Sequence, residues 1–163
     1  MKKMDFILSK ILAGEHIERT LAYWRFKNRR IVFTNGCFDI IHRGHVDYLA
    51  RASELGDVLV VGLNTDRSVT AIKGPSRPLQ DQEGRALVLA SMSFVTAVIL
   101  FDQETPLELI MQIRPDILVK GSDYPPEQIV GYDFVISSGG RVETLDFVEG
   151  YSTTSILKKI SGS

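Results

Sequence analysis

Short apolar runs alternate with helical patterns along most of the chain. Runs rich in apolar and β-branched residues predict strands at residues 31–35, 57–63, 95–101, 116–120 and 134–137, and a shorter last strand at 141–145. Apolar residues at helical spacing predict helices between most of them, at residues 45–55, 65–72, 82–92 and 106–113. Near-continuous apolar strands separated by helices indicate a parallel sheet covered on both faces, which is the doubly wound α/β plan.

The first thirty residues precede this alternation and are expected to form an N-terminal helical extension (1–30) to a domain at residues 31–163. Apolar residues at positions 4, 7, 8, 11 and 12 follow helical spacing up to Gly14, and Ile17, Leu21 and Trp24 predict a second helix. The extension could be a partner surface. Packing on the flank of the domain is favoured, because apolar helix faces usually join the same core.

Composition narrows the class of protein. A length of 163 residues is enough for one domain with its own core. Lys and Arg number 19 against 20 Asp and Glu, so the broad basic surface of a nucleic-acid or membrane binder is missing and neither partner is expected. Asp5 and Lys10 interrupt the first apolar stretch, no run approaches a membrane span, and the single cysteine cannot form an internal disulfide. These features predict a cytoplasmic protein.

Ligands of open parallel sheets bind beyond the carboxyl ends of the strands. The loops after Asn35, Leu63 and Lys120 leave such ends, and they hold the most distinctive residues of the chain. The sequence has no G-x-G-x-x-G after its first predicted strand and no G-x-x-x-x-G-K-[ST], so neither a dinucleotide fingerprint nor a Walker loop is present.

The segment TNGCFDIIHRGHVDYL (34–49) joins a predicted strand to a helix and contains two of the three histidines. A helix that begins near Arg43 or Gly44 leaves its first amides unpaired, so an anion would be stabilised there, and Gly36 and Gly44 let the backbone approach it. His42 and His45 share a helical face and could both donate to one phosphate. They could also be ordinary residues of a helix start, or half of a metal site.

The string GCFDIIHRGH resembles the G-x-F-D-x-x-H-x-G-H signature of the nucleotidyltransferase superfamily, which includes glycerol-3-phosphate cytidylyltransferase and pantetheine-phosphate adenylyltransferase. Four further strings, VVGLNTD (60–66), KGPSRP (73–78), PDILVKGSDY (115–124) and EGYSTTSI (149–156), resemble in this order the motifs of the heptose 1-phosphate adenylyltransferases, which make ADP-heptose. The match spans about residues 31–160.

This resemblance implies a Rossmann-like nucleotidyltransferase fold and direct in-line transfer of AMP from ATP to a heptose 1-phosphate, with ADP-heptose and pyrophosphate as products. The expected acceptor is D-glycero-β-D-manno-heptose 1-phosphate or a close stereoisomer. Mg²⁺ bound through the ATP phosphates, a homodimer or higher homo-oligomer, and a product used in lipopolysaccharide core assembly are implied as well. Related proteins often carry a fused sugar kinase, for which this chain is too short, so a stand-alone form is expected.

Each implied role belongs to a residue that matches the family pattern. Nucleotidyl transfer brings two anions together, which requires cations, imidazoles and helix dipoles around the reacting phosphorus. The implied catalytic residues are His42, His45 and Lys73. The implied nucleotide-binding residues are Cys37, Phe38, Gly44, Lys120, Gly121, Asp123, Gly150, Ser152, Thr153 and Thr154. The implied substrate-binding residues are Asp39, Asn64, Asp66, Arg77 and Arg85.

Several of these residues also have ordinary structural interpretations. Lys73, Arg77, Arg85 and Lys120 could be solvated surface cations, while the NTD and STTS strings could simply cap helices. Asp39 would repel phosphates, so it is expected to orient its loop or to hold a cation or a hydroxyl, and the loop role is favoured. Cys37 could be a nucleophile, but direct transfer needs no covalent intermediate.

The chain departs from the cytidylyltransferases at Phe147, where their motif begins with an arginine. This departure weakens the main alternative, a cytidylyltransferase acting on a polyol or amino-alcohol phosphate. A second alternative is a nucleotide-binding regulator that performs no transfer. The presence of His42, His45 and Lys73 argues against it.

Overall fold

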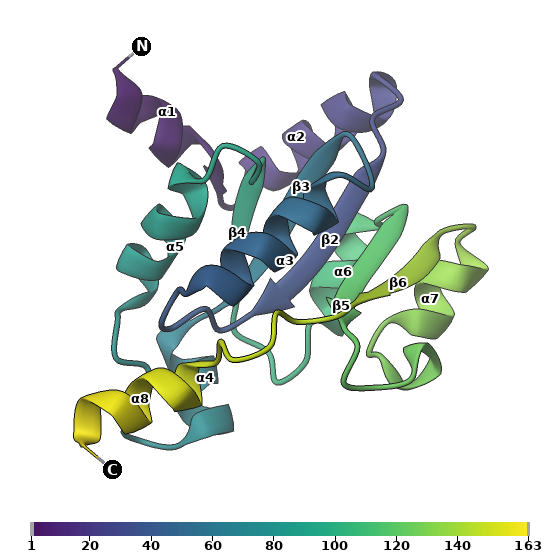
Figure 1. The fold of residues 1–163 in the computed structure, drawn as a ribbon. Coiled ribbons are helices and arrows are strands. Elements are labelled where there is room, and N and C mark those ends of the chain that lie inside the picture. The colour runs from purple at the N-terminus through teal and green to yellow at the C-terminus, as the bar shows by residue number, and fades with distance from the viewer. Residues whose placement is uncertain (1, 163) are drawn as a thin grey trace.

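The computed structural model describes residues 2–162, which form one six-stranded parallel sheet with helices on both faces (Figure 1). The strand order is β1-β4-β3-β2-β5-β6. The strands are β1 (Ile11–Leu12), β2 (Ile31–Gly36), β3 (Val58–Asn64), β4 (Ala97–Phe101), β5 (Ile117–Gly121) and β6 (Arg141–Leu145). The doubly wound α/β plan and five of the six predicted strands are confirmed.

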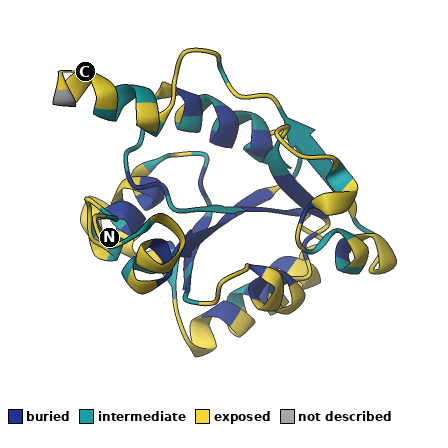
Figure 2. Ribbon diagram, turned by 90° about the horizontal axis from the view of Figure 1, so that it is seen from below, coloured by how far each residue is buried: buried dark blue, intermediate teal, exposed yellow. Residues whose placement is uncertain are grey.

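Helices cover the sheet in two layers. They are α1 (Lys3–Ser9), α2 (Glu15–Phe26), α3 (Arg43–Ser53), α4 (Asp66–Lys73), α5 (Gln82–Ser91), α6 (Leu107–Ile113), the short 3₁₀ turn η1 (Pro126–Gln128), α7 (Tyr132–Ser137) and α8 (Thr153–Ser161). Side chains of α3 and α5 pack on one face, and those of α2, α6 and α7 pack on the other. In Figure 2 the buried residues lie in the sheet and along the inner sides of these helices.

The alternation of side chains along each strand divides the core between the two faces. In β2, Ile31 and Phe33 join the core beneath α2 and α6, whereas Val32 joins the core beneath α3. All seven residues of β3 are buried, as expected for a central strand covered on both sides. Each fully buried aliphatic or aromatic side chain contributes roughly 1.5–3 kcal/mol, so these two clusters dominate the stability of the domain.

The strand predicted at residues 134–137 is wrong, because these residues belong to helix α7. A four-residue apolar run fits a buried strand or one buried face of a helix equally well. The tertiary structure decides between them. Strands β5 and β6 are parallel neighbours, so the chain must cross back over the sheet between them, and α7 lies in this crossover with Val135 fully buried.

The first residues also differ in part from the predicted helix over positions 4–12. Helix α1 ends at Ser9, and Ile11 and Leu12 form the edge strand β1 beside β4, where the amide of Val98 donates to the carbonyl oxygen of Lys10 at 2.8 Å. The second predicted helix is confirmed as α2, whose Ile17, Leu21 and Trp24 lie in the core. The first thirty residues therefore contribute to the sheet and to its packing.

The strand order creates a topological switch point at β2. The chain proceeds from β2 to β3 on one side, and β5 later pairs with β2 on the other side. Connections that leave in opposite directions open a crevice beyond the carboxyl ends of β2 and β5. This end of the sheet lies near α4 and α8 in Figure 1.

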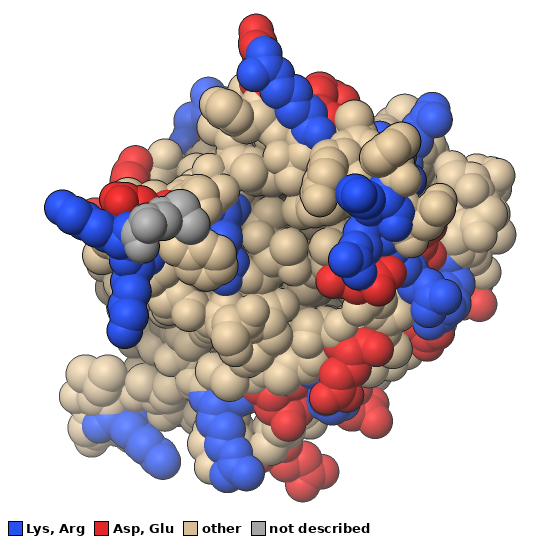
Figure 3. Space-filling model, turned by 90° about the horizontal axis from the view of Figure 1, so that it is seen from above, with Lys and Arg blue, Asp and Glu red and all other residues tan. Residues whose placement is uncertain are grey.

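The opposite end of the molecule, seen in Figure 3, carries Lys and Arg side chains close to Asp and Glu side chains. A cavity of about 370 Å³ lies there between α2 and β5, lined by Arg25, Arg29, Arg30 and Arg114 among others. Two of these arginines serve the fold, since Arg25 donates to the carbonyl oxygen of Ile113 at 2.6 Å and Arg29 pairs with Asp57. Within residues 2–162, no helix has both the length and the apolar character needed to cross a membrane.

Candidate active site

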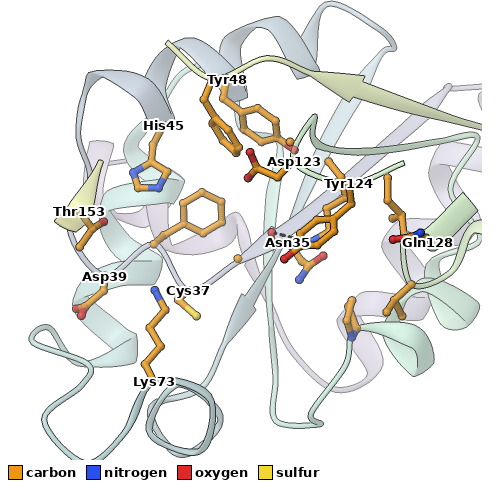
Figure 4. Close-up of a pocket in the computed structure, with 18 residues that line it drawn as sticks. Asn35, Cys37, Asp39, His45, Tyr48, Lys73, Asp123, Tyr124, Gln128 and Thr153 are labelled. Carbon is orange, nitrogen blue, oxygen red and sulfur yellow. Dashed lines mark hydrogen bonds between the residues drawn. The ribbon is translucent and has the colours of Figure 1, made fainter. Parts of the chain in front are cut away.

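A cavity of about 440 Å³ lies at the carboxyl ends of β2 and β5, as the switch point predicts. Its walls come from segments far apart in the sequence: the loop after β2, the end of α4, the residues after β5, Phe147 and the start of α8. Figure 4 shows His45, Lys73, Asp39, Cys37 and Thr153 at one end of this cavity. Asn35, Asp123, Tyr124 and Gln128 lie at the other end.

The loop after β2 turns sharply between Gly36 and Phe38. Phe38 has a left-handed φ of 47°, an uncommon conformation for a residue with a bulky side chain. Its ring folds back over Gly36, where a Cβ atom would come within 2.9 Å of Phe38 Cε2. Gly36 is therefore required for the shape of the loop, and the turn directs the following residues toward the beginning of α3.

The two histidines of the motif lie together, as the sequence predicts. The His42 and His45 rings stack with their centroids 3.9 Å apart and their planes 28° apart. His45 lines the cavity, and His42, at the N-cap of α3, packs on it. Gly44 makes room for this arrangement, because a Cβ atom there would lie 3.0 Å from His42 Cε1.

Both imidazoles are uncharged near neutral pH. Burial lowers the pKa of His42. Burial also lowers the pKa of His45 to about 4, with further contributions from repulsion by the His42 ring when it is protonated and by the Lys73 ammonium. A neutral imidazole can still donate one N–H hydrogen bond. The pair thus offers donors beside the amino end of α3, whose dipole favours a phosphate at the same place.

Two lysines from different elements line the cavity. Lys73, at the end of α4, is exposed and points into the cavity (Figure 4). Lys120, on β5, is largely enclosed and donates to the carbonyl oxygen of Asn35 at 3.5 Å. Burial lowers the pKa of Lys120 to about 8, so it is mostly protonated at pH 7. The single carbonyl contact replaces little of the hydration that the ammonium has lost. An anionic ligand would therefore stabilise its positive charge.

Asp39 anchors the loop at residues 74–80 over the site. Its buried carboxylate accepts the backbone amides of Leu79 at 2.9 Å and Gln80 at 3.0 Å, and it pairs with Arg77 at 2.6 Å. Burial alone would raise the pKa of Asp39, but these hydrogen bonds and the Arg77 charge lower it. The geometry agrees with the expected loop-orienting role of Asp39. Arg77 already has Asp39 as its ion-pair partner within the protein. Substrate binding by Asp39 or Arg77 stays a prediction.

Arg85 was expected to contact a phosphate, but the structure places it away from the cavity. Its side chain is fully buried in α5 and does not line the cavity. It donates to the carbonyl oxygens of Cys37, Asn64 and Gln80 and pairs with Asp66 at 2.7 Å. Arg85 therefore ties together the loops after β2 and β3 and the loop at 74–80, and its position is that of a scaffold residue.

Asn64 and Asp66 face this buried arginine network. The Asn64 side chain donates to Ser68 Oγ at 2.9 Å. Thr65, the middle residue of the NTD string, caps α4 by accepting a hydrogen bond from the amide of Ser68. The structural interpretation of the NTD string, a helix cap, is thus observed. Neither Asn64 nor Asp66 lines the cavity, so their binding to substrate stays a prediction.

The STTS string begins α8, as its capping pattern indicates. Ser152 accepts the amide of Ser155 at 3.0 Å, and Thr153 lines the cavity. Ser152 and Thr154 are exposed, and Gly150 has a φ of 82° that lets the chain turn into the helix. Of the nucleotide-binding residues expected here, Thr153 is the one that the structure brings to the cavity wall.

Several cavity residues were not singled out as ligand contacts from the sequence. They are Asn35, Tyr48, Pro106, Tyr124, Gln128, Ile129, Val130 and Phe147. Tyr48 donates or accepts a 2.8 Å hydrogen bond with Thr34, and burial raises its pKa to about 12. Its place one turn after His45 on α3 was a usable signal. Residues 128–130 carried no such signal, because they reach the site only through the path of the η1 turn.

Cys37, Phe38, Gly121 and Asp123 also line the cavity, in agreement with their expected positions. The Cys37 sulfur lies 3.9 Å from Asn64 Oδ1. Within residues 2–162, no three His, Cys, Asp or Glu side chains cluster closely enough to hold a metal ion.

Comparison with known proteins links this geometry to a family. The family model described as cytidylyltransferase-like matches residues 33–159. The chain is 54% identical over 152 residues to the bifunctional protein HldE of Syntrophotalea carbinolica and 53% identical to that of Magnetococcus marinus, covering 93% of this chain in both cases. It spans 31% of the length of each of these relatives.

Two solved structures share the fold. The lipopolysaccharide core biosynthesis protein of Thermoplasma volcanium matches 76% of this chain and 99% of its own chain, with a TM-score of 0.59 and 26% identity. The pantoate-beta-alanine ligase of Francisella tularensis matches 93% of this chain and 76% of its own, with a TM-score of 0.57 and 13% identity, a likeness of fold alone.

Proposed function

The chain belongs to the cytidylyltransferase-like family of nucleotidyltransferases, and from this membership we propose that it transfers AMP from ATP to a heptose 1-phosphate. A phosphate oxygen of the sugar attacks the α-phosphorus of ATP, the bond from that phosphorus to the bridging oxygen of the β-phosphate breaks, and pyrophosphate leaves. The products are ADP-heptose and pyrophosphate. The acceptor we propose is D-glycero-β-D-manno-heptose 1-phosphate or a close stereoisomer.

One observation carries the proposal: a stacked pair of neutral imidazoles at the amino end of α3 lies beside a lysine-lined cavity. In the transition state, charge accumulates on the equatorial oxygens of the α-phosphorus and on the leaving group. His42 and His45 would donate hydrogen bonds to these oxygens, and Lys73 would offset the repulsion between the two anions. Holding both reactants in line supplies the rest of the acceleration.

The two sides of the cavity suit different substrates. The β5 side combines Lys120 and Asp123 with aromatic and aliphatic residues and suits the nucleotide. The α4 side, with Lys73 and the loop at residues 74–80, suits the acceptor phosphate. In this division Asp39 and Arg85 act through the loops that they hold.

We propose that Mg²⁺ enters with ATP, bound to its phosphate oxygens. The carboxylate of Asp39 is a poor metal ligand, because Arg77 and two backbone amides already occupy it. Asp123 lines the cavity without a hydrogen bond or ion pair to residues 2–162, so it is the carboxylate that can approach such an ion. When bound, the ion would neutralise part of the triphosphate charge.

The choice of a heptose acceptor is supported by the similarity to the HldE proteins over nearly the whole chain and by the motifs that resemble heptose 1-phosphate adenylyltransferases. The chain spans 31% of those relatives, so the proposal concerns the corresponding portion. The Thermoplasma protein is described as a lipopolysaccharide core biosynthesis protein, which agrees with a product used in that assembly. A cytoplasmic location and a homodimer or higher homo-oligomer belong to the same proposal.

A coupled pyrophosphate assay tests this function. ATP and CTP are each offered with a heptose 1-phosphate, glycerol 3-phosphate and phosphopantetheine, and the His45→Gln variant serves as the inactive control. We expect pyrophosphate release with ATP and heptose 1-phosphate. Release with CTP and a polyol phosphate would instead establish the cytidylyltransferase alternative, and ATP binding without turnover under any sugar phosphate would establish a regulator.

A further inference from the structure

Phe147 is held in a fixed position where the chain leaves β6. Its ring lies directly against the α-carbon of Gly121, since a Cβ atom on that glycine would come within 2.1 Å of Phe147 Cε2. The Tyr48 ring lies on another side, with the ring centroids 5.5 Å apart and the planes 30° apart. Any side chain at position 121 would therefore displace the phenylalanine.

Two arginines of α3 hold the segment that carries this ring. Arg51 donates to the carbonyl oxygen of Asp146, the residue before Phe147. Arg43 donates to the hydroxyl of Tyr151 at 3.2 Å and stacks on its ring, with 5.3 Å between the guanidinium carbon and the ring centroid. The segment is thus attached at both ends, and a fixed ring loses little conformational entropy when a ligand binds.

The ring is not enclosed by these contacts. Phe147 remains 43% exposed and lines the active-site cavity. Its ring lies on Gly121, the last residue of β5, and so belongs to the side of the cavity that suits the nucleotide. Tyr124, which follows β5, lies apart from His45 and Lys73, the groups that suit phosphates (Figure 4). A nucleoside triphosphate is divided in the same way, with a flat base at one end and phosphates at the other.

We propose that Phe147 determines the base preference of the enzyme by stacking on the adenine ring of ATP. The inference deepens the proposed function and rests on it. The phenyl ring has no hydrogen-bonding group, so it can distinguish two bases only by the area of ring surface that each one stacks on it. A purine with two fused rings overlaps it more than a pyrimidine does. A side chain without an aromatic face would therefore weaken ATP binding more than CTP binding.

Isothermal titration calorimetry, with ATP or CTP added to the protein in the absence of any acceptor, tests the inference. The wild type should bind ATP more tightly than CTP. Phe147→Leu removes the aromatic face on which the base stacks, so it should weaken ATP binding by about 10-fold and CTP binding by about threefold or less. Phe147→Tyr keeps the aromatic face and should keep the wild-type preference. Both variants should melt close to the wild-type temperature.

The Gly121→Ala variant tests the same inference without altering Phe147. Its methyl group should push the ring from its place and narrow the ATP preference in the same direction as Phe147→Leu. An ATP-to-CTP affinity ratio unchanged in Phe147→Leu, an equal loss for both nucleotides, or equal binding of both by the wild type would overturn the inference. Because no acceptor is present, a failure to use heptose 1-phosphate in turnover would refute only the proposed function.

Discussion

Replacing the enclosed lysine of the active site should make the protein more stable and less able to bind ATP. In the free protein Lys120 keeps its charge at pH 7, although its surroundings lower its pKa from 10.5 to about 8. Its ammonium donates to one carbonyl oxygen at 3.5 Å, which replaces little of its lost hydration. Methionine has a similar length and no charge, so Lys120→Met removes this cost and keeps the packing.

The size of the effect follows from the pKa. The interval between 10.5 and about 8 corresponds to about 3 kcal/mol at roughly 1.4 kcal/mol per pKa unit. Lys120 keeps some contact with solvent, so we expect a gain of about 2 kcal/mol in the free energy of unfolding at pH 7. For a domain of this size, each kcal/mol raises the melting temperature by roughly 2–4 °C.

The pH dependence identifies the cause. Below pH 8 the lysine is protonated in both folded and unfolded states, and the full cost is present. Between about pH 8 and 10.5 the folded protein has released the proton while the unfolded chain still holds it, so wild-type stability rises through this group. The advantage of Lys120→Met should therefore be constant below pH 8 and disappear by about pH 10.5.

Urea denaturation of the wild type and variants between pH 7 and 10.5 measures this difference. Lys73→Met is the matched control, because Lys73 lines the same cavity but is exposed, and its replacement should change stability by less than about 0.5 kcal/mol. Titration with ATP should show weaker binding to Lys120→Met by about 10-fold or more, since a charge-assisted contact is lost. A Lys120→Met variant that is less stable than the wild type at pH 7 would refute the reasoning.

The remaining predictions concern the histidine pair and the buried arginine. His42→Ala or His45→Ala should lower turnover in the pyrophosphate assay by ~10²-fold or more with an unchanged circular dichroism spectrum, and full activity in both variants would contradict their assignment as transition-state donors. Arg85→Met should lose about 3–5 kcal/mol in urea denaturation, because three carbonyl oxygens and Asp66 lose their partner; normal stability with a raised KM would instead indicate a substrate contact. Because the pKa of His45 falls from 6.5 to about 4 on folding, the wild type should lose up to about 3 kcal/mol as pH decreases through this interval, and His45→Gln should show a shallower loss.

The chain pattern by itself was enough to predict the class of fold and the end of the sheet that holds the site. Strand periodicity and apolar character identified β2 to β5 and β6, because such residues can be buried only in a sheet covered on both faces. The spacing of His42 and His45 placed both rings on one helical face, and the rings stack in the structure. These features are local in sequence, so local rules capture them.

Contacts between distant segments decided the rest. The apolar run at residues 134–137 became a helix because β5 and β6 required a crossover, and residues 11–12 became a strand because the edge of β4 was free to pair. Arg85 was expected to contact a phosphate, but its side chain is buried and donates to groups of residues 37, 64, 66 and 80. Phe147 reached the cavity because Gly121, 26 positions earlier, leaves room for its ring. Residue type and spacing fix which groups can do the chemistry, but packing between segments far apart in the chain fixes which of them meet.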